Sequence, residues 1–234
     1  MASQDTATPA QDELVRRILY RDSCVLILDK PAGITVHAGP TGGPSLEDGF
    51  DALRFGNARR PGLAHRLDRD TSGCLVLGRH TKALRRLGTL FAEGRVTKTY
   101  WAVVEGDPGE DAGTVDAPLA KRTARSGWSM VVDPAGQQAV TDWTRLATAG
   151  GLSLLELRPR TGRTHQIRVH CAALGVPILG DPAYGRGGPG QPLMHLLARA
   201  VSVPYHADRP PASATAPVPP HMRAALAGLA PDAI

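Results

Sequence analysis

The chain has 234 residues, of which 42% are hydrophobic and only 4% aromatic. This length fits one large domain or two small ones, with a core built mainly from Leu, Val and Ala. The formal net charge of +5 is a mild basic excess, which permits a nucleic-acid partner without identifying one. The polar N-terminus and the lack of a long apolar stretch exclude a membrane-spanning helix and favour a soluble, cytoplasmic protein.

The chain order predicts a single domain over residues 12–230, between a disordered leader at 1–11 and a tail at 231–234. Strands are expected at Val15–Tyr20, Cys24–Leu28, Cys74–Leu77, Thr97–Glu105, Gln138–Leu146, Leu152–Leu157, Ala198–Pro204 and Ser213–Val218. Helices are expected at Ser45–Phe55, Thr81–Gly94, Arg163–Leu174 and Pro220–Leu229. Regular βαβ alternation is missing, which predicts an α+β fold with a mixed, largely antiparallel sheet and flanking helices.

The cysteines, Cys24, Cys74 and Cys171, are odd in number and widely spaced. Each lies in an apolar run, so we expect buried free thiols in a reducing compartment. No zinc-ligand spacing is present in the sequence, and we expect neither a metal nor a cofactor.

One nine-residue segment, His65 to Gly73, carries more chemical information than any other part of the chain. It places Asp68 behind His-Arg-Leu and follows it with Arg, Asp, two hydroxyl residues and a glycine. The apolar run after it predicts a buried strand, so we expect Asp68 in a loop that rests on this strand. Neighbouring cations would keep the carboxylate ionised, as a nucleophile or base requires, and the arginines indicate a phosphate-rich substrate.

Two other interpretations of this segment stay open at this point. Asp, Thr, Ser and Gly are common turn residues, so the segment can be a turn without a catalytic role. Asp68 and Asp70 can also be the carboxylate pair of a glycoside hydrolase, because residues two apart on a strand share a face. The turn-like surroundings of Asp70 and the lack of any other sugar-site feature argue against the hydrolase.

Two further segments favour a catalytic role. Lys98 and Tyr100 share a face of a predicted strand, although a strand tyrosine is often only part of the core. Residues Arg158–His170 contain four arginines and two histidines around a predicted helix start. Helix N-termini attract phosphate and nearby arginines strengthen that attraction, whereas the alternative is a solvated basic helix. The residues expected at this phosphate site are Arg160, Arg163 and His165.

Taken together, these segments resemble the RluA family of RNA pseudouridine synthases. The matching stretches, in the family's order, are Asp29–His37, His65–Gly73, Lys98–Tyr100 and Thr161–Gly185. The second and fourth are the most specific, and the resemblance runs from about residue 14 to about 230. Cys74 departs from the family pattern, in which an aliphatic residue is usual. The resemblance implies the pseudouridine synthase fold with a central catalytic cleft, in its minimal form without an N-terminal S4 domain.

The resemblance also implies an activity and a role for individual residues. The chain would be an isomerase that converts specific uridines of rRNA, tRNA or both to pseudouridine, without cofactor or metal. Asp68 would be the catalytic aspartate, Tyr100 would stack on the target base, and Arg168 would pair with Asp68. Arg66 would enter the RNA where the target base leaves the stack. His65 and Arg69 are expected as further RNA contacts, and a monomer is the expected state.

The sequence leaves open how Asp68 would act: by attack on the sugar, by proton removal at C2′, or by addition to the base. It also leaves open a protein that keeps the fold and binds RNA without modifying it. The presence of Asp68, Tyr100 and Arg168 together argues against this second class. The reaction product separates the classes, because isomerisation changes neither the mass nor the length of the RNA.

Overall fold

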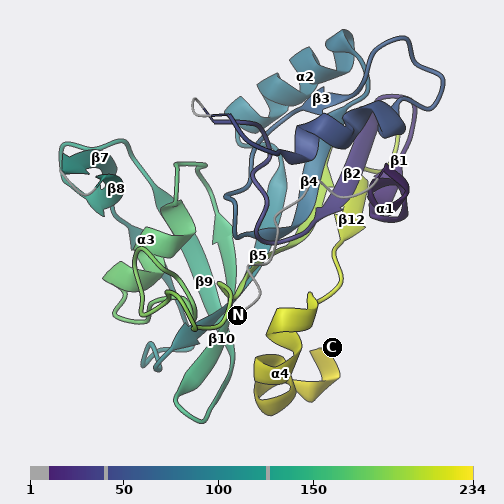
Figure 1. Cartoon of the computed structure of the whole chain (residues 1–234). Coiled ribbons are helices and arrows are strands. Elements are labelled where there is room, and N and C mark those ends of the chain that lie inside the picture. The colour runs from purple at the N-terminus through teal and green to yellow at the C-terminus, as the bar shows by residue number, and fades with distance from the viewer. Residues whose placement is uncertain (1–10, 40–41, 125–126, 234) are drawn as a thin grey trace. The chain divides into compact units, whose positions relative to one another are not determined.

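The computed structural model describes residues 11–39, 42–124 and 127–233. The chain divides into two compact units, and Figure 1 labels most of the helices and strands of both. The first unit comprises Met1–Thr97 and Ala198–Pro217, and the second comprises Lys98–Leu197 and Val218–Ile234. The expected leader at 1–11 lies outside the described residues except for Gln11, and the single domain over 12–230 stays a prediction.

The first unit is an antiparallel sheet with helices packed against it. Within it β2 lies between β1 and β4, β3 also pairs with β4, and β11 pairs with β12. The elements, in chain order, are α1 (Gln11–Arg16), β1 (Ile18–Arg21), β2 (Val25–Lys30), the 3₁₀ helix η1 (Leu46–Leu53), β3 (Gly62–Leu63), β4 (Ser72–Gly78), α2 (Thr81–Ala92), most of β11 (Leu196–Val203) and β12 (Ala212–Thr215).

The strand expected at Val15–Tyr20 is wrong in its first half, because the chain is helical over α1. Acidic residues occupy the first turn of this helix and Arg16 the last, an arrangement that complements the helix dipole. The side chain of Arg17 donates a hydrogen bond to Glu13 one turn earlier, and the side chain of Leu14, within the helix, is fully buried. These local interactions outweigh the β-branched residues that indicate a strand.

Helix α2 packs on β4 much as its sequence periodicity predicts. Leu87 and Leu90 are buried on its inner face, and Gly94 follows its end with a positive φ of 67°. Leu84 lies so close to Gly78 of β4 that a Cβ atom there would come within 2.8 Å of its side chain. The absence of a side chain at Gly78 therefore lets the helix approach the sheet.

The strands β5, β10, β9 and β6 of the second unit pair in this order, each antiparallel to its neighbour. A separate ribbon of β7 and β8 lies beside α3 (Figure 1). The core of the second unit lies between the sheet and α3 and includes Leu155, Leu157 and Ile167. The elements are β5 (Thr97–Glu105), β6 (Ala112–Asp116), β7 (Leu119–Ala124), β8 (Gly127–Val132), β9 (Val140–Ala149), β10 (Leu152–Pro159), α3 (Gln166–Ala173), α4 (Pro220–Leu229) and the short 3₁₀ helix η2 (Pro231–Ala233).

The predicted α+β class with a mostly antiparallel sheet is confirmed by these pairings. Strand β5 and helix α4 have the predicted bounds, whereas β6, β7 and β8 have no counterpart among the predicted elements. In the described parts of the chain, no helix has both the length and the apolar character needed to span a membrane.

The cysteine prediction is confirmed at two of three positions. Cys74 and Cys171 are free and buried, and burial raises the pKa of each thiol to about 12. Cys24 is also free but only half-buried, so the expected burial was wrong there. The reason is that β2 begins at Val25, which leaves Cys24 in the preceding turn.

Candidate active site

The Asp68 loop lies between β3 and β4 of the first unit and is fixed at both ends. Strand β4, which follows it, is buried over its whole length, as the apolar run predicts. Leu67, directly before Asp68, is buried in the core. The N–H of Thr71 donates to the carbonyl oxygen of Asp68 at 3.2 Å, which closes a turn around the half-buried aspartate. Asp68 is thus a carboxylate in a constrained turn that rests on a buried strand.

Lys30, at the end of β2, holds this loop in place through hydrogen bonds to its backbone. Its side chain is fully buried, and its Nζ atom donates to the backbone carbonyls of Pro31, Arg69 and Thr71, each at 2.8 Å. Burial lowers the pKa of Lys30 to about 7, while the charges of Asp70 and Asp68 act in the opposite direction. The contacts of Lys30 therefore support the backbone of the Asp68 loop.

Arg69 is held by the segment that follows β2. The N–H of Gly33 donates to the carbonyl of Arg69, and Nε of Arg69 donates to the carbonyl of Gly33, both at 3.0 Å. This double contact leaves the guanidinium largely exposed, 4.0 Å from the carboxylate of Asp70. Asp70 lies in the turn, the position that its neighbours predict for it.

His65 and Arg66 differ in how the fold uses them. The Nε2 atom of His65 accepts the N–H of Val76 on β4 at 2.9 Å, and its ring stacks on Phe91 of α2, with centroids 4.6 Å apart. His65 therefore ties the loop to both elements. Arg66, the next residue, is exposed.

Tyr100 lies on β5 of the second unit, opposite Leu157 of β10, and is half-buried against the core. Lys98 lies two residues earlier and so on the same face, and its Nζ atom donates to the carbonyl of Thr161 at 3.2 Å. Burial lowers the pKa of Lys98. The contact joins β5 to the Thr-Gly-Arg-Thr-His segment before α3.

Arg168, on α3, is buried and binds the carboxylate of Asp181 through two parallel hydrogen bonds of 2.7 Å. Asp181 also accepts the N–H groups of Ala183 and Tyr184. Burial alone would raise the pKa of Asp181, but Arg168 and these donors hold it below its ordinary value. Asp181 was not singled out from the sequence. The expected pairing of Arg168 with Asp68 joins residues of different units and stays a prediction.

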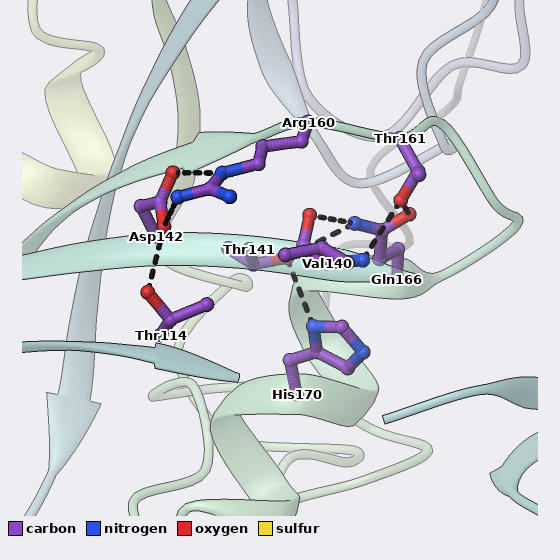
Figure 2. Close-up of polar contacts among 8 residues, drawn as sticks. All are labelled: Thr114, Val140, Thr141, Asp142, Arg160, Thr161, Gln166 and His170. Carbon is purple, nitrogen blue, oxygen red and sulfur yellow. Dashed lines mark hydrogen bonds and ion pairs between the residues drawn. The ribbon is translucent and has the colours of Figure 1, made fainter. Parts of the chain in front are cut away.

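A network of polar contacts fixes the start of α3 on β9 (Figure 2). The amide nitrogen of Gln166 donates to the carbonyl of Val140 and to the hydroxyl of Thr141, both at 3.0 Å. The amide oxygen of Gln166 accepts the hydroxyl of Thr161 at 2.7 Å, and His170 contacts Thr141 one turn later. Because these side chains are mostly buried, the network sets the position of the basic segment relative to the sheet.

The two arginines expected to bind phosphate already have partners in the chain. Arg160 forms a bidentate ion pair with Asp142, whose carboxylate also accepts Thr114 (Figure 2). Nε of Arg163 donates to the carbonyl of Gln138 at 3.0 Å. Both arginines are exposed, so solvent or a ligand can compete for their guanidinium groups.

His165 adopts a left-handed conformation, with φ 53° and ψ 17°, directly before α3. Its ring stacks on Trp128 of β8, with centroids 5.2 Å apart, and its Nδ1 atom lies 2.8 Å from the hydroxyl of Tyr184. That hydroxyl accepts the N–H of Met130, while Lys121 of β7 lies over the Trp128 ring. A non-glycine residue with positive φ costs free energy, which these contacts offset.

Trp128 is 49% exposed, an unusual state for a large aromatic side chain. Sequence reasoning missed both it and Tyr184. The signal that could have found Trp128 is a tryptophan at the start of a run of strand-forming residues, which follows a basic stretch of sequence that begins at Lys121. Together, Trp128, His165 and Tyr184 form an aromatic cluster with Lys121 at its edge.

Comparison with known sequences identifies this arrangement of segments. Residues 24–173 match the family described as RNA pseudouridylate synthase. An uncharacterized RNA pseudouridine synthase of Zymomonas mobilis is 46% identical over 209 residues, which cover 88% of this chain and 95% of that protein. The ribosomal large subunit pseudouridine synthase D of the same organism is 38% identical over 191 residues, which cover 76% of this chain and 59% of that protein.

Solved structures give the same result. Human RNA Pseudouridylate Synthase Domain Containing 4 superposes with a TM-score of 0.77 at 28% identity, over 92% of this chain and 94% of that one. Human RNA Pseudouridylate Synthase Domain Containing 1 superposes with a TM-score of 0.72 at 28% identity, over 86% of this chain and 82% of that one. The predicted family and its fold are therefore confirmed.

Proposed function

Because the chain belongs to the RNA pseudouridylate synthase family, whose members are isomerases that act on RNA, we propose that it converts specific uridines of rRNA, tRNA or both to pseudouridine in the cytoplasm. Asp68 is the catalytic residue in this proposal. The observation that carries it is the constrained Asp68 turn, closed by Thr71, anchored by Lys30 and seated on the buried strand β4.

The proposed reaction breaks the bond between C1′ and N1 of uridine, forms a bond between C1′ and C5, and exchanges the proton lost from C5 for one gained at N1, directly or through solvent. An ionised Asp68 serves any of the three routes to this product, because attack on the sugar, attack on the base and proton removal all need a carboxylate with a lone pair available. A fixed position lowers the entropic cost of reaching the reacting atom, which is what the closed turn contributes.

The other residues have supporting roles in this proposal. Tyr100 stacks on the target base, and its hydroxyl oxygen takes the C5 proton while its own proton passes to N1 or to solvent. Arg168, oriented by its two bonds to Asp181, pairs with Asp68. The ion pair of Arg168 with Asp181 supports this role, because it orients the guanidinium before substrate binds.

The RNA contacts in the proposal follow from exposure and charge. Arg66 is exposed beside the Asp68 turn, where a planar guanidinium can replace part of the stacking that a flipped base loses. Its neighbour His65 supports the loop through Val76 and Phe91. The remaining proposed contacts are Arg69, Arg160, Arg163 and His165.

The test is conversion of RNA by the Asp68→Asn variant. RNA from a strain that lacks this gene is incubated with purified protein, and pseudouridines are mapped by sequencing after chemical labelling. We expect Asp68→Asn to lose at least roughly 100-fold in rate, the usual contribution of a catalytic acid or base. The matched control is Asp70→Asn, which alters another half-buried carboxylate of the same turn and should keep most of the rate.

Thermal unfolding of both variants separates loss of chemistry from loss of the fold. Conversion by Asp68→Asn at the wild-type rate would refute the catalytic role. A wild-type protein that binds the RNA but forms no pseudouridine would show that only the binding function is present.

A further inference from the structure

Three side chains of the first unit with metal-binding atoms converge at one place away from the Asp68 turn. Asp22 and Cys24 lie in the turn between β1 and β2, and His206 follows the end of β11. A carboxylate oxygen of Asp22, the Sγ atom of Cys24 and a ring nitrogen of His206 all lie within 4.8 Å of one another. The sequence shows no zinc spacing here, because the two ends of the cluster are separated by most of the chain.

The ring of His206 gives the strongest indication of a ligand. Its Nε2 atom is shielded from solvent and has no hydrogen-bond partner, a costly state for a buried polar atom. The atom lies 3.6 Å from Oδ2 of Asp22, too far for a hydrogen bond. Two N or O ligands of a tetrahedral zinc ion lie about 3.4 Å apart, given metal–ligand bonds of about 2.1 Å. The observed separation fits two such ligands.

The carboxylate of Asp22 is oriented by its own turn. Its Oδ1 atom accepts the N–H groups of Cys24 at 2.7 Å and of Val25 at 2.6 Å, and its Oδ2 atom accepts the hydroxyl of Tyr20 at 3.0 Å. Hydrogen bonds of this kind orient the ligands of metal sites. They also serve an ordinary turn, so they support the site only together with His206 and Cys24.

We propose that Asp22, Cys24 and His206 bind a zinc ion. One thiolate, one imidazole and one carboxylate make a donor set suited to Zn²⁺, with the fourth position open to water. The ion links the β1–β2 turn to the segment after β11. It stabilises the first unit, because it binds the folded chain and not the unfolded one. This site is independent of the proposed isomerase activity.

The test uses the full chain without a polyhistidine tag, stripped of metal and kept reduced with a non-thiol reductant. We expect wild-type protein to bind one equivalent of Zn²⁺ by calorimetry, and Co²⁺ to give a thiolate-to-cobalt charge-transfer band. At a hundredfold excess of Zn²⁺ over its Kd, the Tm should rise by roughly 5 °C. The variants Cys24→Ser and His206→Gln should lose the band and the Tm rise.

Two control variants change the same residue types elsewhere. His37→Gln alters an exposed histidine of the first unit, and Cys171→Ala alters a buried thiol of the second unit. Both should keep the cobalt band. Because the readout is the response to metal, a variant of lower basal stability remains informative as long as it unfolds cooperatively. A wild-type protein without the band, or a band that persists in Cys24→Ser, would overturn the proposal.

Discussion

The side-chain nitrogen of Lys30 lies 2.8 Å from the carbonyl oxygen of Thr71, the residue that closes the turn begun by Asp68. The same group reaches the carbonyls of Pro31 and Arg69, so one buried side chain joins β2 to both sides of the turn. These three hydrogen bonds are to backbone carbonyls, so we expect Lys30 to act by positioning the backbone that carries Asp68. This arrangement leads to a prediction about stability and a second about pH.

Replacement of Lys30 by methionine is predicted to destabilise the protein by roughly 2–4 kcal/mol. Methionine keeps the apolar stem but leaves buried carbonyls without their donor, which is more costly than the loss of an exposed contact. Unfolding in urea measures the difference. Lys82→Met, which alters an exposed lysine of α2, is the control and should change the free energy of unfolding far less. Equal effects of the two substitutions would contradict an anchoring role for Lys30.

The contribution of Lys30 to stability is predicted to increase with pH. Its pKa is lowered by burial from the ordinary 10.5 to about 7, so between these values the unfolded chain binds the proton and the folded chain does not. Stability rises with pH wherever the unfolded state binds more protons, here by up to about 1.4 kcal/mol per pH unit. The free energy of unfolding of wild type minus that of Lys30→Met isolates the effect. A constant difference from about pH 7 to about pH 10 would show that the three carbonyls keep Lys30 charged in the folded protein.

Asp181 and Asp142 both form bidentate ion pairs with arginine, but in different surroundings. The pair of Asp181 with Arg168 is buried, whereas that of Asp142 with Arg160 is largely exposed. Asp181→Asn removes a charge partner from a buried guanidinium and is predicted to cost roughly 3 kcal/mol. Asp142→Asn is the matched control, and its effect should be far smaller and should fade with added salt. Unfolding in urea measures the free energy of unfolding of both variants. Equal decreases would contradict the larger contribution expected of the buried ion pair.

Hydrophobic periodicity predicted the elements that are buried on one face. Strand β5 and helix α4 have the predicted bounds, and α2 was placed to within two residues. The ribbon of β7 and β8 was missed because most of its side chains are exposed, and a pattern that reports burial is weak where burial is absent. The end of helix α1, Val15 and Arg16, was taken for the start of a strand, because the stability of this helix comes from end charges and one buried leucine.

The candidate site was predictable where its residues are close in sequence. Asp68 and its turn form one segment, and the basic segment around Arg168 forms another. The supporting contacts were not predictable, because Lys30 meets Thr71 across 41 positions and Arg168 meets Asp181 across 13. Such pairs depend on how strands and helices pack, which local patterns do not encode.

Trp128 is predicted to contribute to RNA binding, since an exposed indole beside a lysine offers a stacking surface for a base. One base stacked on an aromatic ring contributes about 1–3 kcal/mol, so Trp128→Ala should weaken RNA binding by roughly 5- to 150-fold. Equilibrium binding at fixed salt measures this for an RNA that the wild-type protein modifies. Leu146→Ala is the control, because Leu146 is 45% exposed but aliphatic.

The Tm of Trp128→Ala should fall only slightly, because half of the residue's surface is already exposed and His165 keeps its contact with Tyr184. A large loss of Tm would instead identify Trp128 as a support for the strained His165 backbone. Unchanged RNA affinity with an unchanged Tm would contradict both roles. Since Tyr184 and His165 join the β7–β8 ribbon to the start of α3, a stacked base on Trp128 would bring RNA to the segment that carries Arg163 and Arg168.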